Sequence, residues 1–276
     1  MSGLQSPVRP IRNKEKAFKA LTFWSMPFVM PILAQKNRRV FCSIKNKLTE
    51  KTIQFIIEKI MEDAMKLDGI IFDLDGTLWD SCRVVAESWA KTLREQYGAE
   101  KLPDTDDVKS IMGMTAVGIA EKLFSHYGDR AMELCHACMA EELNYLSEHS
   151  GDVYPGVETM LGTLGEEYPL FIVSNCQDGY IQCFFKASGF VKFIEDIECA
   201  GSSGLGKADN IRLIMARNGL KKAVYVGDTA GDEKSARDAG CSFIHAAYGF
   251  GQAEAPDAAA QSPAELEALI HSMEEE

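Results

Sequence analysis

The feature that most constrains the fold of this chain is a series of five short apolar runs, each long enough for one β-strand. Helical or glycine-rich segments separate the runs, as in parallel sheets that helices cover on both faces. The runs are Gly69–Asp73, Leu170–Ser174, Ile194–Cys199, Ala223–Gly227 and Cys241–Ala246. The pattern predicts an α/β protein whose functional groups lie at the carboxyl ends of the strands.

A long helical segment interrupts this alternation between the first and second runs. Residues 82–151 contain no strand-like run, and their apolar residues recur at helical spacing. We therefore predict a Rossmann-like parallel sheet core formed by residues 65–81 and 152–276, with a helical cap of residues 82–151 inserted after the first strand. Such a cap should close over the strand ends and exclude bulk water and large substrates.

Charge divides the chain into two parts of different character. Residues 1–64 contain 12 Lys and Arg against 5 Asp and Glu, whereas the remaining 212 residues have a net charge of −19. The overall charge of −12 argues against a nucleic-acid partner, because phosphate contacts need clustered basic side chains. A small anionic ligand would instead need local cations or a metal ion.

We expect residues 1–64 to be a dispensable extension or a leader that precedes a true start at Met65. This basic segment lacks the alternation of strands and helices seen in the rest of the chain. An alternative stays open, because Ile53, Ile56 and Ile60 recur at helical spacing and suit an amphipathic helix that docks on the core or on a partner. Loss of folding or activity in a chain that starts at Met65 would refute the first interpretation.

The eight cysteines have no regular spacing, which favours free thiols in a reducing, cytoplasmic compartment. Cys135 and Cys138 resemble half of a metal site, but no second Cys or His pair follows at a suitable spacing, so we expect both to pack in the interior. The apolar stretch from Ala20 to Ala34 is too short to span a membrane, which needs about 20 apolar residues. We therefore expect a soluble protein without a membrane partner, as a monomer or homodimer.

Two aspartates follow the first apolar run in the stretch Phe72-Asp-Leu-Asp-Gly-Thr77. Alternation along the strand would point Asp73 and Asp75 to the same side, and Gly76 allows a sharp turn directly after them. Neighbouring carboxylates repel each other, and a divalent cation relieves this repulsion for one while leaving the other free to move a proton. For this motif taken alone, an acidic turn without a function is the alternative.

Other predicted strand ends carry groups that suit a phosphate and a metal ion. The second run ends in Ser174, whose hydroxyl can bind a phosphate oxygen, and Lys207 follows a glycine-rich loop as a point charge. The fourth run is followed by two more carboxylates, Asp228 and Asp232, and hard cations such as Mg²⁺ prefer oxygen ligands of this kind. Further candidates for phosphate binding, next to these groups in the sequence, are Thr77 and Asn175.

The order of these motifs is similar to that of the haloacid dehalogenase-like (HAD) superfamily. The most specific pair is FDLDGTLWDS with YVGDTAGDEKSARDAG, and the resemblance covers residues 65–251. It implies a Mg²⁺-dependent phosphotransferase in which Asp73 attacks phosphorus to form an aspartyl-phosphate, while Asp75 protonates the leaving oxygen and then activates water. By the same resemblance, Ser174 and Lys207 hold the phosphoryl oxygens.

The resemblance also implies a metal site and a substrate class. The metal ligands would be Asp73, the main-chain carbonyl of Asp75, and Asp228, with Asp232 supporting the metal or Lys207 from behind. The position of the helical cap is similar to that in phosphoglycolate phosphatases and β-phosphoglucomutases. The implied substrate is a small phosphorylated metabolite, either phosphoglycolate or a sugar phosphate.

Three alternatives differ in their chemistry. Gly201–Lys207 matches the first part of a P-loop, but Ala208 stands where a Mg²⁺-binding hydroxyl is needed, which disfavours a kinase or NTPase. A phosphomutase of the β-phosphoglucomutase type would have the same cap placement; such mutases often carry Val in place of Thr77, so the threonine favours a phosphatase. A catalytically idle regulatory protein on the same fold is the third alternative.

Three local expectations concern the surroundings of this site. Asp80 and Ser81 are the candidate N-caps for the first helix of the cap. Trp79 should contact the lid that the cap forms. The loop from Ile111 to Thr115 should supply specificity contacts, although no charged residue within it identifies a substrate.

Overall fold

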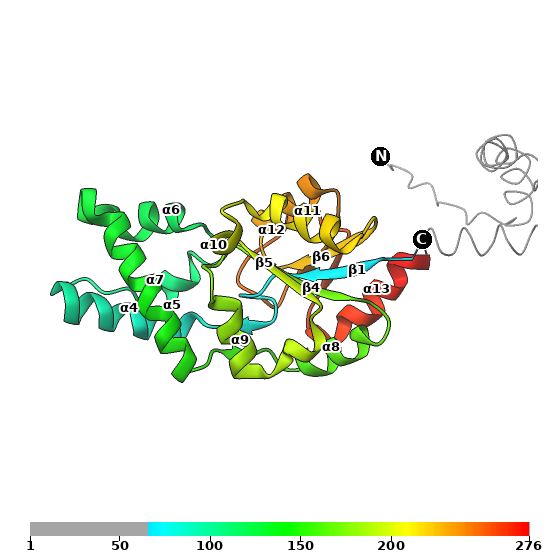
Figure 1. Cartoon of the computed structure of the whole chain (residues 1–276), viewed down its shortest axis with the longest axis horizontal. Helices are drawn as coiled ribbons and strands as arrows, with labels where there is room; N and C mark the ends of the chain where they lie inside the picture. The colour runs from blue at the N-terminus through cyan, green and yellow to red at the C-terminus, as the bar shows by residue number, and fades with distance from the viewer. Residues whose placement is uncertain (1–65, 276) are drawn as a thin grey trace, which may run out of the picture. The chain divides into compact units, whose positions relative to one another are not determined.

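The computed structural model describes residues 66–275, and the predictions for residues 1–64 lie outside this range. A parallel sheet of six strands forms the centre of the core, in the order β5-β4-β1-β6-β7-β8 (Figure 1). The strands are β1 (Gly69–Phe72), β4 (Leu170–Ser174), β5 (Asp196–Cys199), β6 (Ala223–Gly227), β7 (Ser242–Ala246) and β8 (Ala258–Ala260). The predicted α/β fold with a parallel sheet is confirmed.

Strand β1 lies in the interior of the sheet, between β4 and β6, and all of its residues are buried. Ile71 pairs with Phe171 of β4 on one side and with Tyr225 of β6 on the other. Side chains alternate between the two faces, so Ile71 belongs to one apolar cluster while Ile70 and Phe72 belong to the other. Because these strands are parallel, their carboxyl ends meet at one edge of the sheet.

Helices cover both faces of this sheet (Figure 1). On one face α11 contacts β4 and β5, and α12 contacts β6 and β7; on the other, α8 contacts β4 and α13 contacts β8. The helical elements of the core are α8 (Val157–Gly165), α9 (Tyr180–Ser188), η3 (Phe190–Phe193), α10 (Ala200–Ser203), α11 (Lys207–Asn218), α12 (Ala230–Ala239), η4 (Pro263–Glu265) and α13 (Leu266–Glu275). Burial on both faces explains why the strands appear in the sequence as continuous apolar runs.

The chain between β1 and β4 contains a layer of helices to one side of the core (Figure 1). Its elements are α4 (Cys82–Tyr97), α5 (Thr105–Lys109), α6 (Ala116–Ile119), η1 (Ala120–Phe124), η2 (Ser125–Arg130) and α7 (Ala131–Glu148). Helices α4 and α7 pack together, and the rings of Trp89 and Phe124 lie 5.8 Å apart within this layer. Cys135 and Cys138 are buried in α7 as packing residues. We call this layer the cap.

Two short strands that the sequence did not predict lie at the base of the cap. Strand β2 (Trp79–Asp80) pairs antiparallel with β3 (Asp152–Val153), one on each side of the inserted helices. The side chain of Trp79 is fully buried, and its ring packs edge-on against Tyr180 and Phe184 of α9 at 5.8 and 5.2 Å. Its contact with the lid stays a prediction. Within residues 66–275, no helix is both long and apolar enough to cross a membrane.

Candidate active site

The first part of the site is the turn that follows β1. The N–H of Asp73 donates to the carbonyl of Val226 at 2.8 Å, so this residue still follows the register of the sheet. Gly76 has a φ of +83°, and a Cβ at this position would overlap the carboxylate of Asp228. Only glycine therefore allows the turn that brings the end of β1 against the residue that follows β6.

Three carboxylates meet beside this turn. One oxygen each from Asp73, Asp228 and Asp232 lies within 4.8 Å of the others, and all three side chains are buried. Oδ1 of Asp73 and Oδ1 of Asp228 have no hydrogen-bond partner. Burial, reinforced by Asp232, raises the pKa of Asp73 to about 8 and that of Asp228 to about 7. Neighbouring carboxylates whose oxygens lack hydrogen-bond donors fit a hard divalent cation, which would bind the oxygens and relieve the repulsion.

Lys207, the first residue of α11, is buried between two of these carboxylates. Its Nζ lies 2.5 Å from Oδ1 of Asp232 and 3.0 Å from Oδ1 of Asp73, and only the contact with Asp232 has hydrogen-bond geometry. Burial lowers the pKa of Lys207, but Asp232 and Asp73 raise it well above its usual value, so the side chain stays charged. Lys207, the lysine of the P-loop-like segment, therefore forms ion pairs with Asp73 and Asp232.

Asp75 lies in a different environment from Asp73. Its Oδ1 accepts hydrogen bonds from the hydroxyl of Ser81 at 2.7 Å and from that of Tyr180 at 3.0 Å. The Tyr180 hydroxyl also lies 2.8 Å from the Ser81 oxygen, which closes a three-membered network. Burial raises the pKa of Asp75 to about 6, and the two hydrogen bonds oppose this rise. Ser81 occupies the predicted N-cap position of α4, but its side chain makes no capping bond, because its hydroxyl binds Asp75 instead.

The other predicted phosphate ligands lie in different settings. Ser174 is buried at the end of β4 and lines the same cavity as Asp73 and Asp75. Asn175 lines this cavity too, and its amide donates to the carbonyl of Gly113 in the cap at 2.8 Å. The Thr77 hydroxyl is buried without a hydrogen-bond partner, and Thr77 is not among the residues that line the cavity.

The cavity, of about 50 Å³, lies between the strand ends and the cap. On the cap side it is lined by residues of α4, α6 and α7 and by four consecutive residues of the predicted specificity loop, Ile111 to Met114. Most of these side chains are apolar. A cavity of this size excludes large ligands, and the aspartates of the core form its polar end.

Sequence reasoning missed one acidic residue in the cap, Glu142 of α7. Its side chain is buried and lines the cavity. The indole N–H of Trp89 donates to Oε2 at 2.5 Å, and the amide of Gln177 donates to Oε1 at 3.2 Å. Burial raises the pKa of Glu142 to about 8, against the effect of the bond from Trp89. Among the described residues of the cap, Glu142 provides the acidic side chain in the cavity lining.

The comparisons with known proteins point to one family. The family model for haloacid dehalogenase-like hydrolases matches residues 70–246. A phosphoglycolate phosphatase from Chromobacterium violaceum is 28% identical over 231 residues, covering 74% of this chain and 96% of that protein. The phosphoglycolate phosphatase of Escherichia coli strain K12 is 27% identical over 234 residues, covering 68% and 84%. A solved haloacid dehalogenase-like family hydrolase from Streptococcus pneumoniae superposes with a TM-score of 0.65 at 25% identity, covering 74% of this chain and 98% of that one.

The matched region runs from β1 to the end of β7 and contains the whole cap. It therefore includes both aspartates of the first turn, the buried lysine and the two carboxylates that follow β6. The family predicted from the order of the sequence motifs is confirmed. This chain belongs to the haloacid dehalogenase-like hydrolase family.

Proposed function

We propose that this hydrolase is a Mg²⁺-dependent phosphatase that cleaves a small phosphate monoester through an aspartyl-phosphate intermediate. The observation that carries the proposal is the contrast between two aspartates at one strand end. Asp73 adjoins Lys207 and two further carboxylates, whereas Asp75 is held by the hydroxyls of Ser81 and Tyr180. Two carboxylates in such different environments suit the roles of nucleophile and proton carrier.

Asp73, Asp228 and the main-chain carbonyl of Asp75 would hold the metal ion, and Asp232 would position Lys207. Oδ1 of Asp73 and Oδ1 of Asp228, which have no hydrogen-bond partner, support this assignment. When bound, Mg²⁺ neutralises negative charge on the phosphoryl oxygens and on the carboxylates around it. Lys207 supplies a second positive charge beside Asp73, and Ser174 supplies a hydroxyl in the cavity lining.

The reaction proceeds in two displacements at phosphorus. In the first, an oxygen of Asp73 attacks phosphorus, the bond to the ester oxygen breaks, and Asp75 gives that oxygen its proton. In the second, Asp75 takes a proton from water as the water oxygen attacks phosphorus; the bond to Asp73 breaks and inorganic phosphate leaves. A pKa of about 6 for Asp75 allows both forms of the carboxyl near neutral pH.

Small esters are the favoured substrates because the cavity between core and cap is about 50 Å³. The names of the curated relatives point to phosphoglycolate, and a sugar phosphate is the other class that the sequence motifs imply. A panel of phosphorylated metabolites tests the proposal, with inorganic phosphate and isomerised product measured in parallel. We expect Mg²⁺-dependent phosphate release; isomerisation of a sugar phosphate without phosphate release would identify a mutase instead.

The Tyr180 hydroxyl should set the pH dependence of the second displacement. Hydrolysis of the phosphoenzyme requires Asp75 as a carboxylate, so its rate falls as pH drops through the pKa of Asp75, about 6. The hydrogen bond from Tyr180 lowers that pKa. In Tyr180→Phe, the pH at which the rate falls to half should therefore be higher by up to about one unit. Single-turnover rates measured against pH check this shift.

Tyr145→Phe is the matched control for this measurement. Tyr145 lies on α7 of the cap, and its hydroxyl bonds to Glu87 at an exposed site. The control should leave the profile unchanged. If the rate of Tyr180→Phe falls at the same pH as that of the wild type, the tyrosine does not act through Asp75.

A further inference from the structure

We propose that the leaving group of the substrate carries a hydrogen-bond donor, as a hydroxyl or an ammonium group, and carries no carboxylate. This inference rests on the proposed phosphatase function and selects among the small esters that suit it. It favours a phosphorylated polyol, sugar or amino alcohol over phosphoglycolate. The observations that carry it are a preorganised acceptor on the cap side of the cavity and the absence of a cation from the described cavity lining.

The acceptor is the carboxyl group of Glu142. Trp89 of α4 and Gln177 of the core each donate one N–H to it, and the Gln177 amide also donates to the carbonyl of Met139 at 2.6 Å. These bonds fix the carboxyl group at the cavity wall and connect the cap to the loop after β4. The carboxyl group keeps free lone pairs beside these two bonds, and a hydroxyl or ammonium donor on the ligand would favour its ionised, accepting form, so acceptor capacity is left for a ligand.

The rest of the cap wall provides no positive charge. Among the described residues that line the cavity there is no Lys, Arg or His, and the cap residues other than Glu142 present apolar or backbone groups, apart from the Trp89 indole. A substrate carboxylate held here would lie in a small, largely apolar space without a counter-ion. An ionised Glu142 would repel it, and a protonated Glu142 would offer a hydrogen bond but no neutralising charge.

The phosphate end of the substrate would lie beside different groups from those of the cap wall. Lys207 lies 3.0 Å from Asp73, and the three carboxylates around it suit a divalent cation. Lys207, together with the divalent cation that these carboxylates would hold, would supply the positive charge that the phosphoryl group needs on the core side. The cap side accepts hydrogen bonds, which matches a hydroxyl or an ammonium group.

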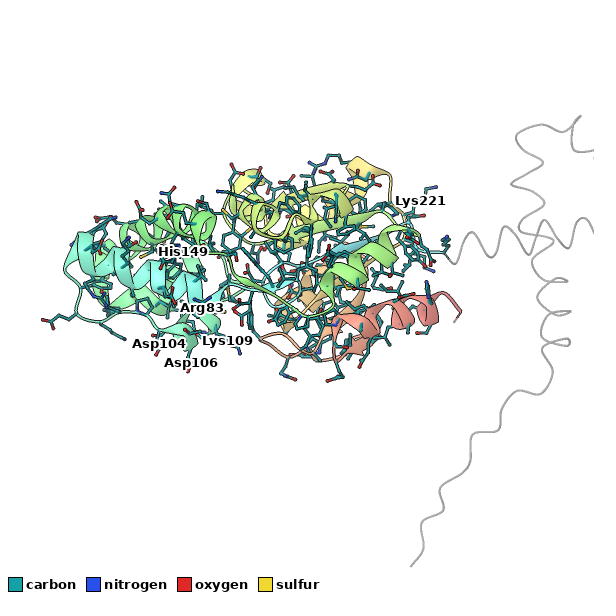
Figure 2. The ribbon with its side chains drawn as sticks, turned by 90° about the horizontal axis from the view of Figure 1, so that it is seen from below. Arg83, Asp104, Asp106, Lys109, His149 and Lys221 are labelled. Carbon is teal, nitrogen blue, oxygen red and sulfur yellow. The ribbon has the colours of Figure 1, made fainter. Side chains whose placement is uncertain are left out.

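Lys109 is the competing source of positive charge. It is an exposed residue at the end of α5, and Figure 2 shows it on the part of the cap that approaches the core. Its ammonium lies 5.4 Å from the centre of the Phe250 ring, and it is not among the residues that line the cavity. Movement of this side chain into the cavity on substrate binding would supply the missing counter-ion, so Lys109 belongs in the test.

The test uses three esters with one two-carbon skeleton: 2-phosphoglycolate, 2-hydroxyethyl phosphate and phosphoethanolamine. They differ only at the end that faces the cap, which is a carboxylate, a hydroxyl or an ammonium group. With the full chain and Mg²⁺, kcat/KM should be at least about tenfold higher for the hydroxyl and ammonium esters than for phosphoglycolate. Glu142→Gln should reduce the difference in kcat/KM between the esters, because it should raise the value for phosphoglycolate and lower the value for phosphoethanolamine. Glu141→Gln, at an exposed neighbouring position, should change none of the three values.

Binding to the Asp73→Asn variant separates this inference from the proposed function. Calorimetric titration of the three esters into that variant with Mg²⁺ ranks them without any turnover. The same ranking by affinity supports the inference even if no ester is hydrolysed, an outcome that would overturn only the phosphatase proposal. Preference for phosphoglycolate in the wild type overturns the inference, and so does an unchanged ranking in Glu142→Gln. A selective loss of phosphoglycolate turnover in Lys109→Met would assign the specificity to Lys109 instead.

Discussion

Asp73→Asn should reduce phosphatase turnover by at least about 10⁴-fold, the scale of loss seen when a catalytic nucleophile is removed. The amide is uncharged and cannot attack phosphorus as a carboxylate does. The substitution hardly changes the volume, and it removes one of three neighbouring carboxylates. The variant should therefore fold normally, and its melting temperature without metal should not fall below that of the wild type. Phosphate release and thermal melts measure the two effects.

The matched control is Asp106→Asn, on the exposed surface of α5 (Figure 2). It makes the same chemical change outside the site and should keep wild-type turnover. Turnover near the wild-type level in Asp73→Asn, with Mg²⁺ present, would contradict the assignment of Asp73 as the nucleophile. A misfolded Asp73→Asn protein would show that the carboxylate has a structural role that we do not assign to it.

Removal of divalent metal should abolish turnover, and addition of Mg²⁺ should restore it. A readout without catalysis is the melting temperature. At a Mg²⁺ concentration 100 times its Kd, binding to the native state adds about 2.7 kcal/mol, which corresponds to a rise of about 5–10 °C for a domain of this size. Asp228→Asn removes a carboxylate with an unpaired oxygen and should lose most of this rise. An equal rise in both proteins would place the metal elsewhere.

The size of this metal effect should depend on pH in a defined direction. Burial raises the pKa of Asp73 to about 8 and that of Asp228 to about 7, above their ordinary value of 3.8. Folding without metal therefore binds protons, and the stability contributed by these groups is lost progressively as pH rises from the ordinary pKa of 3.8 to about 7–8. Mg²⁺ binds the deprotonated carboxylates, so its stabilisation should be larger at about pH 8.5 than at about pH 6.

The sheet could be predicted from the sequence because four of its strands, β1, β4, β6 and β7, are buried almost throughout, and the edge strand β5 is partly buried. Such strands require continuous apolar runs, and the observed bounds of β1, β5 and β7 differ from the predicted ones by only one or two residues. Strand β8 consists of three alanines, and β2 and β3 have two residues each, so none of them carries a recognisable run. Their pairing depends on neighbours that only the folded chain provides.

The surroundings of the predicted site residues were harder to foresee. The Tyr180 hydroxyl reaches Asp75 across 105 positions of sequence, so no local pattern connects them. Ser81 had an ordinary local interpretation as a helix cap, and tertiary structure gave its hydroxyl another partner. Glu142 did leave a signal, because it occupies the buried stripe of α7 between Cys138 and Leu146, where an acid is out of place.

The most direct test of the central claim is a search for the phosphorylated form of Asp73. The wild-type protein is mixed with Mg²⁺ and a turned-over ester, quenched in acid within the first turnover, and digested for mass spectrometry. We predict a phosphoryl group on the peptide that contains Asp73, removable by hydroxylamine as an acyl phosphate should be, and absent from Asp73→Asn. Rapid release of inorganic phosphate with no phosphorylated peptide at any quench time, or with the phosphoryl group on another residue, would contradict the account.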